Sequence, residues 1–181
     1  SKEEMAAQRH GVFIETLEKL KDPDPTVRVQ TALDALFPGW TTSKNGPDLN
    51  PGFRDTVEVG CGGAVEKCIV THPPAKERAV VLSRTLRVPE GRPTVHFEVA
   101  NFPCGDFGLE VFVDDVRLLK TDVGNPPGYK TWRYNFRAFD VSLAPWIGKT
   151  VEVKLVNRPT GWNSEGAVWR DICVRANSAN D

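Results

Sequence analysis

The 181-residue sequence contains no apolar run close to the roughly 20 residues that a membrane-spanning helix requires, so we expect no insertion into a membrane. It also has no excess of either charge, because 23 lysines and arginines stand against 24 aspartates and glutamates. A general nucleic-acid binder carries a basic excess that neutralises phosphates, so nucleic acid is not an expected partner. With 40% hydrophobic and 26% charged residues, the composition is that of a globular protein.

The sequence also lacks the short motifs of the common enzyme classes. It contains no nucleophile elbow, phosphate-binding loop, zinc-binding helix motif or glycine-rich dinucleotide fingerprint. Its three histidines, His10, His72 and His96, fall on a predicted helix, a proline-rich loop and a predicted strand. We therefore expect that the chain is not an enzyme. A hydrolase is the catalytic alternative, and two close acids in a deep pocket, one with a raised pKa, would distinguish it.

The first 40 residues have a helical pattern. Apolar residues at helical spacing predict an amphipathic helix over residues 3–21, which the prolines of the segment 22–25 end. A second helix is predicted to begin at Pro25, with Asp24 as its N-cap, and to end before Pro38. Two helices joined by so short a turn predict a helical hairpin.

This hairpin carries a recognisable pattern. The segment from Leu20 to Arg28, followed by Ala32, Ala35 and Leu36, resembles one HEAT repeat in its leucine, aspartate–proline turn, valine–arginine and alanine–leucine order. A single repeat cannot form a solenoid, because each repeat needs neighbours. We interpret the hairpin as an appendage packed on the main domain, and the end of a repeat array is the alternative.

Beyond residue 50 the pattern is one of short strands separated by glycine- and proline-rich turns. Alternating apolar and polar residues predict strands over 79–88, 94–99, 107–113, 116–121, 132–138, 150–157 and 167–174. Short strands in this number, without helices between them, predict an antiparallel β-sandwich.

Three stretches, in this order, resemble the galactose-binding-like jelly-roll domains: residues 82–100, residues 105–115 and residues 139–172. The last stretch ends in an alanine-x-tryptophan-x-aspartate-isoleucine pattern from Ala167 to Ile172. The resemblance covers about residues 57–176. It implies a mainly β protein with a helical hairpin over 1–40, a jelly-roll sandwich over 41–176 and a tail over 177–181.

Domains of this kind are non-catalytic and are common in extracellular carbohydrate-binding proteins. The resemblance therefore implies a monomeric binding module for carbohydrate within a larger exported bacterial protein, either secreted or held in the cell envelope, such as in the periplasm. A structural or protein-docking domain, whose partner is another protein, is the alternative.

Carbohydrate recognition needs an aromatic face for the sugar C–H groups and planar polar groups for the hydroxyls. Trp162, Asn163 and Glu165 lie together in a glycine-containing segment, where an aromatic ring is expected to be exposed. Trp40 and Asn45 lie in a second segment of similar composition. These five residues are the candidate ligand-binding residues, and packing of Trp162 over the end of the sandwich is the alternative.

Calcium is the one metal that the sequence suggests. Glu165 and Asp171 lie near the end of the chain, and Asp48, or alternatively Asp55, lies before the first predicted strand. Their carboxylates would converge if the two termini of the sandwich meet, and calcium prefers such oxygen ligands. Solvated acids and caps of turns are the alternative interpretation of the same residues.

The four cysteines leave the redox state open. In an exported protein Cys61 and Cys68 are the expected disulfide, because Gly62 and Gly63 between them would turn the chain back. Four reduced and mostly buried thiols are the alternative.

Overall fold

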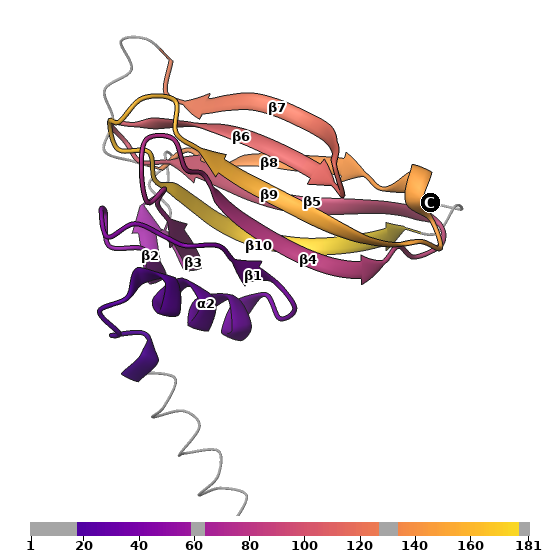
Figure 1. Ribbon diagram of the computed structural model, residues 1–181, viewed down its shortest axis with the longest axis horizontal. Helices are drawn as coiled ribbons and strands as arrows, with labels where there is room; N and C mark the ends of the chain where they lie inside the picture. Colours follow the sequence, from indigo (N-terminus) through magenta and orange to yellow (C-terminus); the bar gives the residue numbers. More distant parts are fainter. Residues whose placement is uncertain (1–17, 59–63, 127–133, 178–181) are drawn as a thin grey trace, which may run out of the picture.

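The chain folds into two facing five-stranded sheets, which a computed structural model describes for residues 18–58, 64–126 and 134–177 (Figure 1). The first sheet has the order β1 (Thr41–Thr42), β4 (Val80–Arg87), β9 (Thr150–Arg158), β6 (Asp106–Val113) and β7 (Val116–Gly124). The second has the order β2 (Gly52–Glu58), β3 (Ala64–Thr71), β10 (Ala167–Asn177), β5 (Arg92–Asn101) and β8 (Arg137–Ser142). All paired strands are antiparallel, so the predicted antiparallel sandwich is confirmed.

The core lies between the two sheets. Buried and more exposed residues alternate over residues 150–155 of β9, as the sequence predicts for a strand with one face in the core and one face towards solvent. Trp169 of β10 joins the layers, because its ring centroid lies 5.8 Å from that of Phe97 in its own sheet and 6.3 Å from that of Phe107 in the other. The indole Nε1 of Trp169 donates to the Thr71 hydroxyl at 2.9 Å, which satisfies the polar group of this buried ring.

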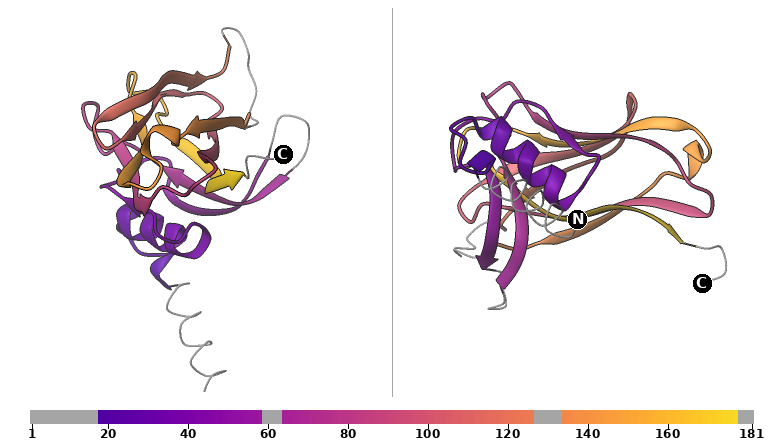
Figure 2. Two further views of the ribbon diagram at one scale, coloured as in Figure 1. Left: turned by 90° about the vertical axis from the view of Figure 1, so that its right-hand side faces the viewer. Right: turned by 90° about the horizontal axis from the view of Figure 1, so that it is seen from below.

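Helix α2 (Pro25–Leu36) closes one side of the sandwich, where it packs against β1, β2 and β3 (Figure 2). Asp24 caps it as predicted, since its carboxylate accepts the backbone N–H of Thr26 at 2.8 Å. The buried residues of α2 belong to the same core cluster as the inner faces of the sheets: Val29, Ala32 and Leu33. The helix is therefore part of the sandwich core.

The other helix of the predicted hairpin, over residues 3–21, falls mainly in residues 1–17, which lie outside the described ranges. The hairpin therefore stays a prediction. In the described part of the chain, no helix combines the length and the apolar character needed to cross a membrane.

The strand predicted over 132–138 begins later, because β8 starts at residue 137. Tyr134 and Phe136 lie instead against the outer face of the second sheet. The ring of Tyr134 meets that of Phe102 edge-on at 5.6 Å, and the guanidinium of Arg170 lies 4.0 Å above the ring of Phe136. These contacts hold the two aromatic residues outside the main core, although their alternation in the sequence resembles that of a core strand.

The predicted disulfide between Cys61 and Cys68 is not formed, because Cys68 is a free and fully buried thiol. Cys61 itself lies outside the described residues. Strands β2 and β3 pair from Glu58 opposite Ala64, and Cys68 lies four residues farther along β3, about 13 Å at the usual rise of a strand. Its thiol therefore lies along the hairpin rather than at the Glu58–Ala64 end where the prediction needed it.

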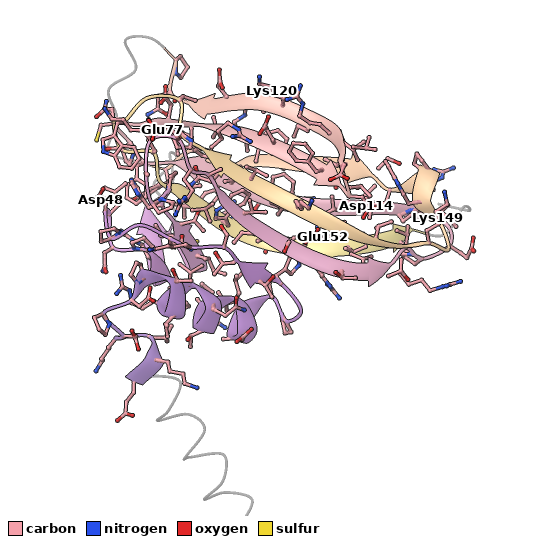
Figure 3. The ribbon with its side chains drawn as sticks, viewed as in Figure 1. Asp48, Glu77, Asp114, Lys120, Lys149 and Glu152 are labelled. Carbon is pink, nitrogen blue, oxygen red and sulfur yellow. The ribbon has the colours of Figure 1, made fainter. Side chains whose placement is uncertain are left out.

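Several of the described connecting segments meet at one end of the sandwich, which we call the loop end: residues 43–50, 72–79, 102–105, 125–126 and 159–166. Strand register brings three of these segments together, since Ala167 lies opposite both Thr71 and Asn101. Figure 3 shows Asp48 and Glu77 at this end and Asp114 and Lys149 at the opposite end.

Candidate functional site

The buried side chain of Glu165, which is only 1% exposed, holds the backbone of the loop between β9 and β10. One carboxylate oxygen accepts the backbone N–H groups of Gly161 at 3.0 Å and Asn163 at 3.2 Å, and the other accepts that of Thr160 at 2.9 Å. These bonds compensate for the burial of the charge. The sequence predicts that Glu165 contacts a ligand; the structure places it beside both hollows of the loop end, with both carboxylate oxygens already bonded to the loop backbone.

The same loop presents Trp162 on the surface of the protein. Its side chain is 40% exposed, which agrees with the expectation that a tryptophan in this segment is open to solvent. Its ring lies against that of His72, with the centroids 5.5 Å apart and the planes at 73°. Trp162 is therefore held in place by a ring contact on one side and is free on the other.

Trp162 forms one wall of a small hollow of about 170 Å³, which we call the Trp162 hollow. The residues around it are Asp48, Leu49, His72, Trp162, Ser164 and Glu165. They come from three of the segments of the loop end. Asp48 is exposed, so its carboxylate is available at the rim.

His72 supplies a buried polar group to this hollow, since the residue is only 3% exposed. Its Nδ1 lies 2.8 Å from the carbonyl oxygen of Pro73, which can only accept, so Nδ1 carries the proton of the neutral ring. Among the described residues no group bonds to Nε2, which is then an acceptor. Burial lowers the pKa of His72 below its ordinary value of 6.5, although the Pro73 bond and the charges of Asp48 and Glu165 oppose the shift.

Asn45, a predicted ligand-binding residue, positions His72 instead of facing a ligand. Its side-chain amide donates to the Thr42 hydroxyl at 2.8 Å and to the Ser43 carbonyl at 3.1 Å, and its Oδ1 accepts the backbone N–H of His72 at 3.2 Å. The adjacent Gly46 N–H donates to the His72 carbonyl at 2.9 Å. Asn45 is 2% exposed and both its donors are used, so the prediction is corrected.

Trp40, the other predicted aromatic ligand residue, lies in the core. It is 1% exposed and belongs to the cluster that contains Val29 and Leu33 of α2. The sequence predicts an exposed ring here, but the end of α2 covers it, so Trp40 has no face to offer a ligand.

Asn163 lies on the other side of the β9–β10 loop from the Trp162 hollow. It lines a larger hollow of about 430 Å³ together with Asp106, Asn125 and Thr160, which we call the Asp106 hollow. Within it the Thr160 hydroxyl donates to Asp106 Oδ1 at 2.7 Å, and Asn163 Nδ2 donates to the Cys104 carbonyl at 3.3 Å. The walls of this hollow thus carry side-chain amides, a hydroxyl, peptide carbonyls and the carboxylates of Asp106 and Glu165.

The predicted calcium ligands do not converge. Glu165 is occupied by backbone N–H groups, as described above, and Asp48 is at the rim of the Trp162 hollow. Asp171 lies four residues beyond Ala167 in β10, about 13 Å along the strand. Over the described ranges no group of three or more His, Cys, Asp or Glu residues could hold a metal ion, so this set of ligands is corrected.

Asp171 meets a different partner, Glu98 of β5, on the second sheet. Burial raises the pKa of Asp171, and its hydrogen bond and the negative charge of Glu98 raise it further. Burial would also raise the pKa of Glu98, but hydrogen bonds from Arg170 and Asp171 outweigh it and lower that pKa. Asp171 and Glu98 are thus two close acids whose pKa values are shifted in opposite directions. They line neither of the two hollows.

Comparisons with protein-family models and with the sequences of curated proteins find no match. A comparison with solved structures does. The Stig cyclase Fisc from Fischerella sp. TAU, in complex with (3Z)-3-(1-methyl-2-pyrrolidinylidene)-3H-indole, has a TM-score of 0.52 and 17% identity over 79% of this chain and 87% of that one. The K1 cleaved adhesin domain of Lys-gingipain from Porphyromonas gingivalis W83 has a TM-score of 0.52 and 13% identity, and the match covers 77% of this chain and 92% of that one. TmCBM61, in complex with β-1,4-galactotriose, has a TM-score of 0.48 and 12% identity, and the match covers 80% of this chain and 94% of that one.

At these identities the likeness shows the fold, which fits the galactose-binding-like β-sandwich that the sequence resembles. The prediction that the chain is not an enzyme is contradicted by this comparison, because the Stig cyclase, which shares the fold, is an enzyme. Missing motifs and a resemblance to binding modules do not separate the binding modules from the enzymes that share one sandwich.

His72 and Asp106 are two residues of these hollows that the sequence did not suggest as ligand contacts. A histidine followed by two prolines at the end of a strand is a weak signal, and an aspartate before a strand is weaker still. Both residues can be recognised as lining a hollow only from the structure, because each hollow is formed by loops that are distant in the sequence.

Proposed function

We propose that this chain is a binding module that holds a carbohydrate at the loop end, with the ring of Trp162 as its stacking face. The observation that carries the proposal is the pairing of an exposed tryptophan with a buried histidine in one hollow. A sugar presents an apolar C–H face together with hydroxyl groups, and this hollow offers a partner for each.

The apolar contribution comes from Trp162. The ring is already fixed by His72, so little conformational freedom remains to be lost when a ligand stacks on it. A rigid aromatic side chain that is exposed on a loop, rather than folded into the core, is typical of a ligand contact.

The polar contribution comes from His72 Nε2 and from the carboxylate of Asp48. Both are hydrogen-bond acceptors when His72 is neutral, and both lie around the same hollow. Ligand hydroxyl groups are donors that suit such acceptors, whereas an anionic group would be repelled by Asp48. A carbohydrate ligand also agrees with the exported location predicted from the resemblance, which stays a prediction.

The experiment is a binding screen with neutral oligosaccharides by glycan array, followed by calorimetric titration of each positive. Trp162→Ala is expected to weaken binding by at least about tenfold, which corresponds to the roughly 1.4 kcal/mol expected of one aromatic contact. Val116→Ala is the matched control, because it removes another exposed apolar side chain, at the β6–β7 turn. Failure of every neutral glycan to bind, or equal affinities of the two variants, would overturn the proposal.

A further inference from the structure

The two hollows of the loop end share one loop, and consecutive residues of that loop serve different hollows. Trp162 and Ser164 line the Trp162 hollow, whereas Gly161 and Asn163 line the Asp106 hollow. Glu165 borders both and fixes the loop backbone between them. The loop is therefore a narrow ridge, with residues only about 3.8 Å apart along the backbone reaching into two separate spaces.

The Trp162 hollow is small for a complete ligand site. Its volume of about 170 Å³ is below the 300–1,000 Å³ typical of ligand pockets. A ligand stacked on Trp162 must therefore extend beyond this hollow. The Asp106 hollow, of about 430 Å³, is the space on the other side of the ridge.

Two side-chain oxygens of the Asp106 hollow accept no hydrogen bond from the described residues. Asp106 uses Oδ1 for the Thr160 hydroxyl, and within the described ranges no group bonds to its Oδ2. Asn163 uses Nδ2 for the Cys104 carbonyl, and no described group bonds to its Oδ1. Both oxygens belong to residues that line this hollow, and as acceptors they can receive the hydroxyl groups of a ligand.

We propose that the ligand is a neutral, linear oligosaccharide that lies across the β9–β10 ridge, with one sugar unit in the Trp162 hollow and the following units in the Asp106 hollow. This inference rests on the proposed function and adds a second subsite to it. The carboxylates of Asp48 and Asp106, one at each hollow, disfavour uronic-acid or sulfated chains through like-charge repulsion.

The test is a ladder of one to four units of β-1,4-linked glucose, galactose, mannose and xylose, titrated calorimetrically, with oligogalacturonides as acidic comparators. Affinity is expected to rise at least about tenfold from one unit to the longest chain, as one or two extra hydrogen bonds allow, and the acidic chains are expected not to bind. Asn163→Ala and Asp106→Asn should each lower the affinity for the longest chain and leave that for the single sugar unchanged.

The outcomes separate the two proposals. If a single sugar binds as tightly as the longest chain and Trp162→Ala abolishes both, the second subsite is refuted and the proposed function stands. If Asn163→Ala weakens the single sugar as much as the longest chain, the second subsite is likewise refuted. If no member of the ladder binds, the proposed function fails and this inference fails with it. Val116→Ala serves again as the variant that should change neither affinity.

Discussion

The rings of His72 and Trp162 meet nearly at right angles with their centroids 5.5 Å apart, which couples the end of β3 to the β9–β10 loop. His72 keeps its proton on Nδ1 because Pro73 accepts it there. A change in the charge of this one ring would alter both the acceptor in the Trp162 hollow and the support of the stacking face.

Acidification is therefore expected to release the ligand. Burial holds the pKa of His72 below its ordinary value of 6.5, so the ring is neutral at pH 7 and Nε2 accepts a ligand hydroxyl. Protonation turns Nε2 into a donor and removes this bond. Affinity should be constant above pH 6.5 and fall by about tenfold once the pH is below the lowered pKa, as loss of one hydrogen bond implies.

Calorimetric titrations between pH 8 and pH 4.5 measure this effect, and His72→Gln is the control because its amide oxygen accepts without titrating in this range. The charged groups around the hollow, Asp48 and Glu165, oppose the shift of the His72 pKa. Asp48→Asn should therefore move the loss of affinity to lower pH. An affinity that rises on acidification would show that the ligand is anionic.

Glu165 is expected to matter for the stability of the loop rather than as a ligand contact. Glu165→Ala leaves the backbone N–H groups of Thr160, Gly161 and Asn163 without their acceptor, and partial access to water limits the cost to about 2–4 kcal/mol. Urea unfolding measures the loss, and glycan binding should weaken with it. Glu77→Ala, an exposed acid at the same end, is the control (Figure 3). Lost binding at unchanged stability would instead make Glu165 a ligand contact.

The sandwich could be predicted where a strand has one buried and one wet face. The strand predicted over 150–157 agrees with β9 (Thr150–Arg158), because buried and more exposed residues alternate over its first six positions. Strand β3 shows why a strand that is buried on both faces could not be predicted from alternation. Cys68, Ile69 and Val70 are all fully buried, since a second small cluster covers the outer face of this sheet, and alternation is lost.

The candidate site was harder to predict, because long-range contacts decide which of two similar residues faces solvent. Trp40 and Trp162 lie in segments of similar composition, yet α2 buries the first and the loop fixed by Glu165 exposes the second. Asn45 is committed to His72, 27 residues away in the sequence. Composition pointed to residues that the structure places at the loop end, but the part that each one plays there depends on how the loops pack.

The cysteines are expected to differ widely in reactivity. Burial raises the pKa of the Cys68 thiol to about 11, although the nearby Arg170 lowers it, so at pH 8 only about one Cys68 in a thousand is the reactive thiolate. Cys104 is exposed. Iodoacetamide should therefore label Cys104 in the folded protein and Cys68 only after unfolding in urea, as read by peptide mass spectrometry. Equal labelling of both thiols in the folded protein would contradict the burial of Cys68.

Asp171 offers a test of the carboxyl pair on the second sheet. It lies in an irregular stretch of β10 with φ of 53°, a conformation that aspartate and asparagine tolerate better than most residues. Its pKa is raised in the fold by burial and by Glu98, so the wild-type protein loses stability as the pH rises from the ordinary aspartate pKa through the raised one. An asparagine at this position has no charge to ionise.

Asp171→Asn should therefore stabilise the protein at pH 7 and have little effect at pH 3.5, where the carboxyl of the wild type is largely protonated. The gain should be of the order of 0.5 kcal/mol, because solvent screens this exposed residue. Asp140→Asn is the matched control in the same sheet, on β8, since it removes an acid that lies 2.9 Å from His96 and should not stabilise. The measurement is the urea midpoint of unfolding of the wild type and of each variant at pH 7 and at pH 3.5. A loss of stability for Asp171→Asn at pH 7 would mean that attraction to Arg170 outweighs the repulsion from Glu98, and that Asp171 is held as an anion.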